Sequence, residues 1–135
     1  MHNLAHRHSA VRLAVLKAMD ALVLAGAADA VVIETVVPAM RPLVTDHTPA
    51  VRSAAVGTLA GWMLHASSKA RTTAAAGAAD AAALLAFPTQ LLPLLLLAVK
   101  DDNAESAAKA LATAEQVWSL PLLGPFSWCF GGHRC

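Results

Sequence analysis

Two groups of histidine and cysteine residues have the side chains that could bind a metal. They are His2, His6 and His8 near the N-terminus, and Cys129, His133 and Cys135 near the C-terminus. Imidazole and thiolate are zinc ligands, but a structural zinc site takes four ligands in a folded frame. Neither group reaches that number. We therefore expect solvated histidines at the start of the chain, a frayed tail at its end and no bound metal.

Motifs for catalysis or for nucleotide binding do not occur in the sequence. There is no G-x-x-x-x-G-K-[ST], G-x-G-x-x-G or G-x-S-x-G, so neither a phosphate cradle nor a nucleophile elbow is expected. Asp101 and Asp102 are adjacent and are expected in a turn, not as an acid/base pair. The net charge is +1, and three Trp and three Phe are the only aromatic residues. The sequence predicts no enzyme, no cofactor and no nucleic-acid partner.

The composition favours helices throughout. Ala and Leu together account for 52 of the 135 residues, whereas there is one Ile and no Tyr. Ala and Leu are the strongest helix formers, so an all-β domain is close to excluded. The longest apolar stretch, residues 84–99, is shorter than the roughly 20 residues of a membrane span and contains Pro88 and Pro93. No apolar core of signal-peptide length lies at the N-terminus, so we expect a cytoplasmic protein without a membrane partner.

The chain contains an internal repeat. Residues 43–63 repeat residues 3–23 at an offset of 40 with no gap, and residues 91–101 repeat residues 36–46 at an offset of 55. The matched pairs are Val51 with Val11, Arg52 with Arg12, Trp62 with Leu22, Pro93 with Pro38, and Asp101 with Asp46. A period of about 40 residues with two helices per unit is typical of HEAT and armadillo repeats.

These offsets predict the helices and their grouping. We expect helices over 9–25, 30–44, 50–65, 88–100 and 103–118, with Pro38 and Pro42 bending or splitting the second one. Two HEAT-like repeats are expected over 1–64 and a degenerate third over 87–118. Between them, 65–86 is expected as an Ala-rich, low-complexity loop insertion with some helix, and 119–135 as an irregular tail. The predicted fold is a short right-handed α-solenoid of about 2.5 HEAT/armadillo-like helix pairs.

Residues that recur in the repeat are expected to have structural roles. These positions are Val11, Arg12, Asp46, Pro49, Val51, Arg52, Trp62, Pro93, Asp101 and Trp118. For the two arginines, a ladder to Asp or carbonyl groups of the adjacent unit is favoured over a binding surface. Asp46 or Thr48 could cap the helix that follows them. The two tryptophans are expected as core residues between repeats. Both ends of the stack lack a polar cap, so we expect self-association through them.

The repeat resembles a known family. Asp46, Pro49, Val51 and Arg52 form D-x-x-P-x-V-R, which resembles HEAT repeats. The order NLAHRHSAVRLAVLKA, LVTDHTPAVRSAAVGTLAGWML, LLPLLLLAVKDDNAES is similar to the dynein axonemal assembly factor 5 family. This resemblance implies a cytoplasmic, non-catalytic scaffold that helps axonemal dynein heavy and intermediate chains assemble before transport into cilia. It implies dynein chains and co-chaperones as partners.

The chain departs from that family at its C-terminal end. Ala104, Ser106 and Ala107 stand where the motif has Pro, an apolar residue and Arg. Members of the family are far longer, so we expect a fragment or truncated form. Two other functions stay open. One is a generic HEAT/armadillo adaptor in transport or another multiprotein complex. The other is a HEAT-type cofactor lyase or enzyme accessory, for which the sequence offers no acid or nucleophile.

Overall fold

The computed structural model describes residues 7–26, 30–75 and 81–118. These residues form five α-helices and no strand. The helices are α1 (Ser9–Leu24), α2 (Ala30–Val44), α3 (Pro49–Ala75), α4 (Ala81–Ala98) and α5 (Ala104–Trp118). The predicted all-α fold is confirmed. In the described part of the chain, no helix combines the length and the apolar character of a membrane span.

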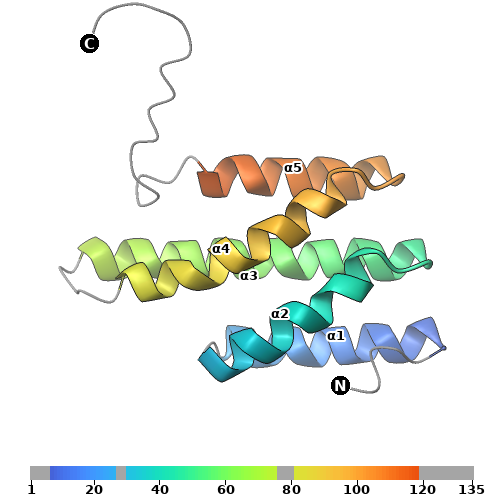
Figure 1. The fold of residues 1–135 in the computed structure, drawn as a ribbon, viewed down its shortest axis with the longest axis horizontal. Coiled ribbons are helices and arrows are strands. Elements are labelled where there is room, and N and C mark those ends of the chain that lie inside the picture. The colour runs from blue at the N-terminus through green and yellow to red at the C-terminus, as the bar shows by residue number, and fades with distance from the viewer. Residues whose placement is uncertain (1–6, 27–29, 76–80, 119–135) are drawn as a thin grey trace, which may run out of the picture.

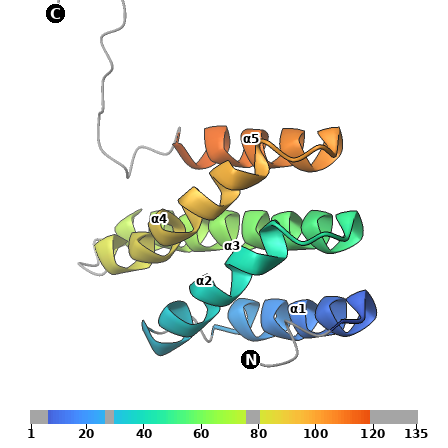
Figure 2. The same ribbon diagram turned by 45° about the vertical axis from the view of Figure 1, so that its right-hand side comes forward.

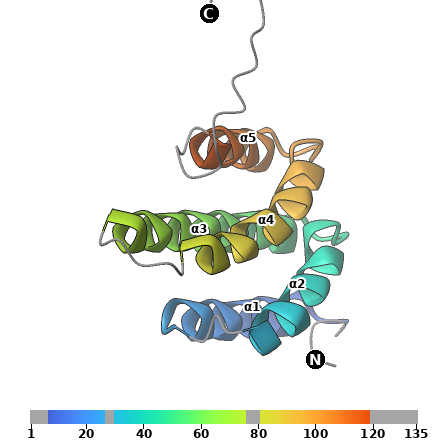
Figure 3. The same cartoon turned by 60° about the vertical axis from the view of Figure 1, so that its left-hand side comes forward.

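The five helices form a two-layer stack. One layer contains α1, α3 and α5, which lie side by side and run in the same direction (Figure 1). The second layer contains α2 and α4, which lead back across the first layer at an angle (Figures 2 and 3). α3 packs against all four of the other helices and is the centre of the fold. This arrangement is a helical solenoid of two helix pairs followed by the first helix of a third.

The core follows the apolar stripe predicted for the central helix. In α3, Val51, Ala55, Leu59 and Trp62 are all fully buried. The same core contains Leu16 and Met19 of α1, Met40 and Leu43 of α2, Leu91 and Leu95 of α4, and Ala110 of α5. A helix that is buried on more than one flank needs neighbours on both sides, and α3 has them because the units stack.

The Ala-rich segment is more helical than the loop insertion expected over 65–86. α3 continues to Ala75, and α4 begins at Ala81. As a result α3 has 27 residues, whereas α1 has 16. Five residues separate the helices of each pair, 25–29 in the first and 76–80 in the second. The additional residues mainly lengthen the helices, since Ala orders into a helix at almost no side-chain entropy cost.

The prolines do not divide α2. The helix runs from Ala30 to Val44 with Pro38 and Pro42 inside it, so of the two predicted outcomes, bending or splitting, the split does not occur. Both proline rings are exposed. Water can therefore hydrate the backbone carbonyls that each ring leaves without a helical donor. Packing of α2 against α3 and α4 supplies the remaining stability.

Candidate functional site

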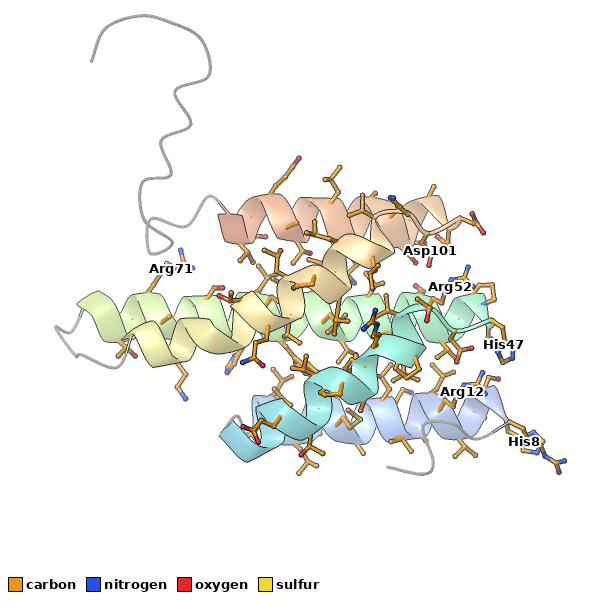
Figure 4. The ribbon with its side chains drawn as sticks, viewed as in Figure 1. His8, Arg12, His47, Arg52, Arg71 and Asp101 are labelled. Atoms are coloured by element: carbon orange, nitrogen blue, oxygen red, sulfur yellow. The ribbon has the colours of Figure 1, made fainter. Side chains whose placement is uncertain are left out.

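The charged residues that recur in the repeat gather along one edge of the stack, where the turns between units lie. Arg12, Arg52 and Asp101 are aligned there, together with the exposed side chains of His8 and His47 (Figure 4). The edge is formed by the N-terminal ends of α1, α3 and α5 and by the turns that precede them. One ion pair connects each unit to the next, and we call this series the ladder: Arg12–Asp46 and Arg52–Asp101.

The first pair of the ladder is buried between α1 and the turn before α3. Arg12 Nε lies 2.8 Å from Asp46 Oδ2, and Arg12 Nη2 donates to Asp46 Oδ1 at 2.9 Å. The same nitrogen donates to Thr48 Oγ1 at 3.1 Å. Asp46 Oδ1 also accepts the Thr48 backbone N–H at 2.8 Å. Arg12 thereby fixes the shape of the turn from which α3 begins.

The second pair joins α3 to the turn before α5. Arg52 Nε lies 2.8 Å from Asp101 Oδ2, and Arg52 Nη2 donates to Asp101 Oδ1 at 3.2 Å. Arg52 Nη1 donates to the Asp46 carbonyl at 2.9 Å. Arg52 therefore contacts the turn before its own helix and the turn of the next unit. The two arginines make the contacts between units that the repeat pattern favours.

Both carboxylates are held in the charged form. Burial raises the pKa of Asp46, but the hydrogen bonds from the Thr48 N–H and from Arg12 outweigh it, so the pKa lies below its ordinary value. The pKa of Asp101 is also lowered. The hydrogen bond from Arg52 is the largest cause of this shift and outweighs the effect of burial, which raises the pKa. Asp101 in turn raises the pKa of the Arg52 guanidinium. Each pair is therefore ionised at neutral pH.

The two turns share a backbone motif that the sequence revealed only in part. Asp46 and Asp101 each accept the N–H of the residue two positions later, Thr48 and Asn103, at 2.8 Å. The carbonyl of Thr48 accepts the first backbone bonds of α3. Asn103 caps α5, because its Oδ1 accepts the N–H groups of Glu105 and Ser106. The preference of Asn for the position before a helix could have identified this cap.

A buried tryptophan completes the contacts between the first two units. Trp62 is fully buried, and its Nε1 donates to Asp20 Oδ1 of α1 at 2.8 Å. Trp118 is the last residue of α5, and its side chain lies outside what the structure describes. Ala107 occupies the position of Arg12 and Arg52, so the third unit has no guanidinium to continue the ladder.

The other predicted positions have packing or surface environments. Val51 is buried and Val11 is half-buried. Pro49 is the first residue of α3, and Pro93 lies in α4, both with exposed side chains. These positions support the helices and bring no reactive groups together.

The histidines and cysteines considered as metal ligands, and expected to bind none, fall almost entirely outside the described part of the chain. His2 and His6 precede it, and Cys129, His133 and Cys135 follow it. Within residues 7–26, 30–75 and 81–118, no three His, Cys, Asp or Glu side chains form a group that could hold a metal ion.

The surface of the second layer is rich in exposed apolar groups. Leu96 and Leu97 of α4 are about half exposed, and Pro38, Pro42 and Pro93 are also exposed. Pro38 and Pro93 are equivalent by the offset of 55, so this feature recurs in both helix pairs. Such groups can form non-covalent contacts with another protein.

Comparison with known proteins gives one match. The family model described as "Dynein axonemal assembly factor 5-like, TPR repeats" matches residues 1–71, just over half of the chain. The matched segment includes α1, α2 and most of α3. No curated protein and no solved structure matches the chain. TPR and HEAT repeats are both helix pairs that stack into solenoids, which agrees with the fold described above.

Proposed function

The chain belongs to the dynein axonemal assembly factor 5-like family, and we propose that it is a non-catalytic, protein-binding scaffold for the cytoplasmic preassembly of axonemal dynein. The observation that carries this proposal is the family match over residues 1–71, which coincides with the first helix pair and most of the central helix. The partners proposed are axonemal dynein heavy and intermediate chains and their co-chaperones.

The geometry supports a scaffold because it fixes the relative positions of the units. The ladder connects α1 to the turn before α3, and α3 to the turn before α5, and the Trp62–Asp20 hydrogen bond adds a second contact between α1 and α3. A repeat protein with such defined junctions presents a continuous surface of set curvature, which is how solenoids bind other proteins. The exposed leucines of α4 and the exposed prolines of α2 and α4 supply apolar contact area on that surface.

The proposal can be tested by affinity purification from cells that are building motile cilia. The tagged full chain is expressed there, and the proteins that copurify are identified by mass spectrometry. Enrichment of axonemal dynein heavy or intermediate chains over a tag-only control is the expected result. Non-ciliated cells expressing the same tagged chain show whether the enrichment depends on dynein assembly.

A matched pair of surface variants sharpens this test. Leu97→Glu adds a charge to the apolar surface of the second layer, and Lys69→Glu changes the charge of an exposed residue of α3. If the second layer binds the partners, the first variant reduces dynein recovery several-fold and the second does not. Recovery of a different complex without any dynein chain would overturn the dynein proposal in favour of a generic adaptor.

A further inference from the structure

One face of the helix layer is buried in α1 and α3 but exposed in α5. Leu16 of α1, Val56 of α3 and Leu111 of α5 are equivalent by the offsets of 40 and 55. Leu16 and Val56 are buried, whereas Leu111 is 48% exposed. Leu16 lies one turn before Asp20, which contacts α3 through Trp62. This face is therefore the one that each unit presents to the following unit.

The opposite face of the layer is open at the N-terminal end. Leu22 of α1, Trp62 of α3 and Val117 of α5 are equivalent by the same offsets. Trp62 and Val117 are buried, whereas Leu22 is 61% exposed. Trp62 faces α1, as its hydrogen bond to Asp20 shows. The exposed side of α1, which also carries Ala14 and Ala18, thus corresponds to the face by which α3 and α5 pack on the preceding unit.

The sequence does not continue the ladder at either end. At the C-terminal end, Ala107 replaces the arginine of the ladder. At the N-terminal end, His6 stands at the position of Asp46 by the offset of 40, and its placement lies outside the described residues. If the next unit carried an aspartate at the position of Asp46, its carboxylate would be buried beside Ala107. No guanidinium would compensate the charge there, and burying an unpaired charge is costly. A second copy of this chain brings no such carboxylate.

We propose that copies of this chain stack end to end, with the Leu111 face of α5 packing on the Leu22 face of α1 in the next copy. The contact continues the α1–α3 and α3–α5 interfaces of the solenoid, using the same two faces. It is heterologous, since each copy contributes a different face, and nothing in it closes the assembly after two copies. Copies therefore add in a row as the concentration rises.

Analytical ultracentrifugation of the full chain over a hundredfold range of concentration tests this stacking. For the unaltered chain the weight-average mass rises with concentration and passes the mass of a dimer. Leu22→Glu and Leu111→Glu each damage one face, and each variant alone sediments as a monomer. Mixed in equal amounts, the two variants form a dimer and nothing larger, because one intact face remains on each partner.

Matched variants separate this contact from other kinds of association. Lys69→Glu changes the charge of an exposed residue of the central helix and associates like the unaltered chain. Leu22→Gln and Leu111→Gln repeat the test without a charge if a glutamate variant loses its helical circular dichroism signal. A chain that stays monomeric throughout overturns the proposal. So does a Leu22→Glu variant that still dimerises alone, because that result indicates a symmetric contact between two α5 helices.

Discussion

Each of the two junctions, α1 with α3 and α3 with α5, contains one ion pair of the ladder. The two pairs differ in how far their side chains are buried. At the first junction, the side chains of Arg12 and Asp46 are 4% and 7% exposed. At the second, Arg52 is 18% exposed and Asp101 2%. The first junction also has the Trp62–Asp20 hydrogen bond, whereas Val117 occupies the position of Trp62 in the second.

This difference shows that one sequence motif can have two energetic roles. An ion pair that is buried on both sides contributes little net stability, but the loss of one partner leaves a charge without compensation. When Arg52 is removed, the carboxylate left behind, Asp101, is itself only 2% exposed, but the site is open to water on the arginine side, so water can enter there and solvate it. We therefore expect the first junction to depend more on its ladder arginine than the second.

The largest effect is expected from removing the arginine of the first junction. Arg12→Met should lower the free energy of unfolding by about 3–5 kcal/mol, the usual loss when one partner of a buried pair is removed. Arg52→Met should cost about 1.5–3 kcal/mol, the value of hydrogen bonds to a charged group. Urea denaturation followed by circular dichroism measures both.

A double variant tests the cause of the larger loss. Asp46→Asn removes the uncompensated charge and keeps the Oδ1 acceptor for the Thr48 N–H. Added to Arg12→Met, it should recover at least about 1 kcal/mol, since the desolvation penalty of the charge is removed. Equal losses for Arg12→Met and Arg52→Met, or no recovery in the double variant, would contradict the contrast between the junctions.

The ladder also predicts a loss of stability in acid. Asp46 and Asp101 both have a folded-state pKa below the unfolded value of 3.8. Their contribution to stability is therefore fully present above about pH 5 and is lost as the pH falls through 4 and below. Asp101→Asn should reduce the proton uptake linked to unfolding in this range by about one proton.

Carboxyl NMR titration distinguishes the two aspartates. The hydrogen bond from Arg52 is the largest cause of the lowered pKa of Asp101, so Arg52→Met should raise the pKa of that carboxyl. In the same variant the pKa of Asp46 should change less, since the Thr48 N–H and Arg12 remain in place. A larger rise at Asp46 than at Asp101 would mean that the two pairs are not independent.

The sequence predicted the helix order and the contacts of the ladder better than the helix lengths. The offsets of 40 and 55 placed Arg12 and Arg52 beside acidic turns, because a repeat brings equivalent residues to equivalent places in the stack. The continuation of α3 through 65–75 was not foreseen, since low-complexity Ala-rich segments form loops as well as helices. Its packing against α4, the next helix of the same pair, is a tertiary contact that composition alone does not predict.

The burial that distinguishes the two junctions could not be predicted from the sequence. Arg12 and Arg52 occupy equivalent positions in nearly identical motifs. Their exposure depends on how the helices pack around each turn, which is a matter of tertiary structure. Likewise, the repeat pattern marks Asp101 and not the residue two positions later, so it does not predict the cap at Asn103.

An intermediate effect is expected at the indole of the first junction. Trp62→Phe keeps most of the buried ring but removes the N–H that donates to Asp20. The expected loss is about 1–2 kcal/mol, which reflects one hydrogen bond to a carboxylate and a small reduction in packing. Asp20→Asn keeps an acceptor and should remain within about 0.5 kcal/mol of the unaltered chain. A similar loss in both variants would indicate that the charge of Asp20, and not its acceptor, stabilises the junction.

The smallest effect concerns the second junction and has the opposite sign. Ser106 stands where the first two units have Val11 and Val51, and it is buried. Within the described residues its hydroxyl has no hydrogen-bond partner. Ser106→Ala should therefore raise the free energy of unfolding by about 1 kcal/mol, because it removes a desolvated hydroxyl and improves helix propensity.

Thr113→Ala is the matched control for this gain, since Thr113 is also buried in α5 but its hydroxyl donates to the Lys109 carbonyl at 2.8 Å. Its removal should leave stability unchanged or lower it by up to about 1 kcal/mol. Thermal unfolding of both variants, read at the same protein concentration, measures the difference in sign. If Ser106→Ala destabilises the chain as well, the third unit uses a polar residue at this position to hold α5 in place. The second junction would then differ from the first in the kind of contact it makes as well as in its burial.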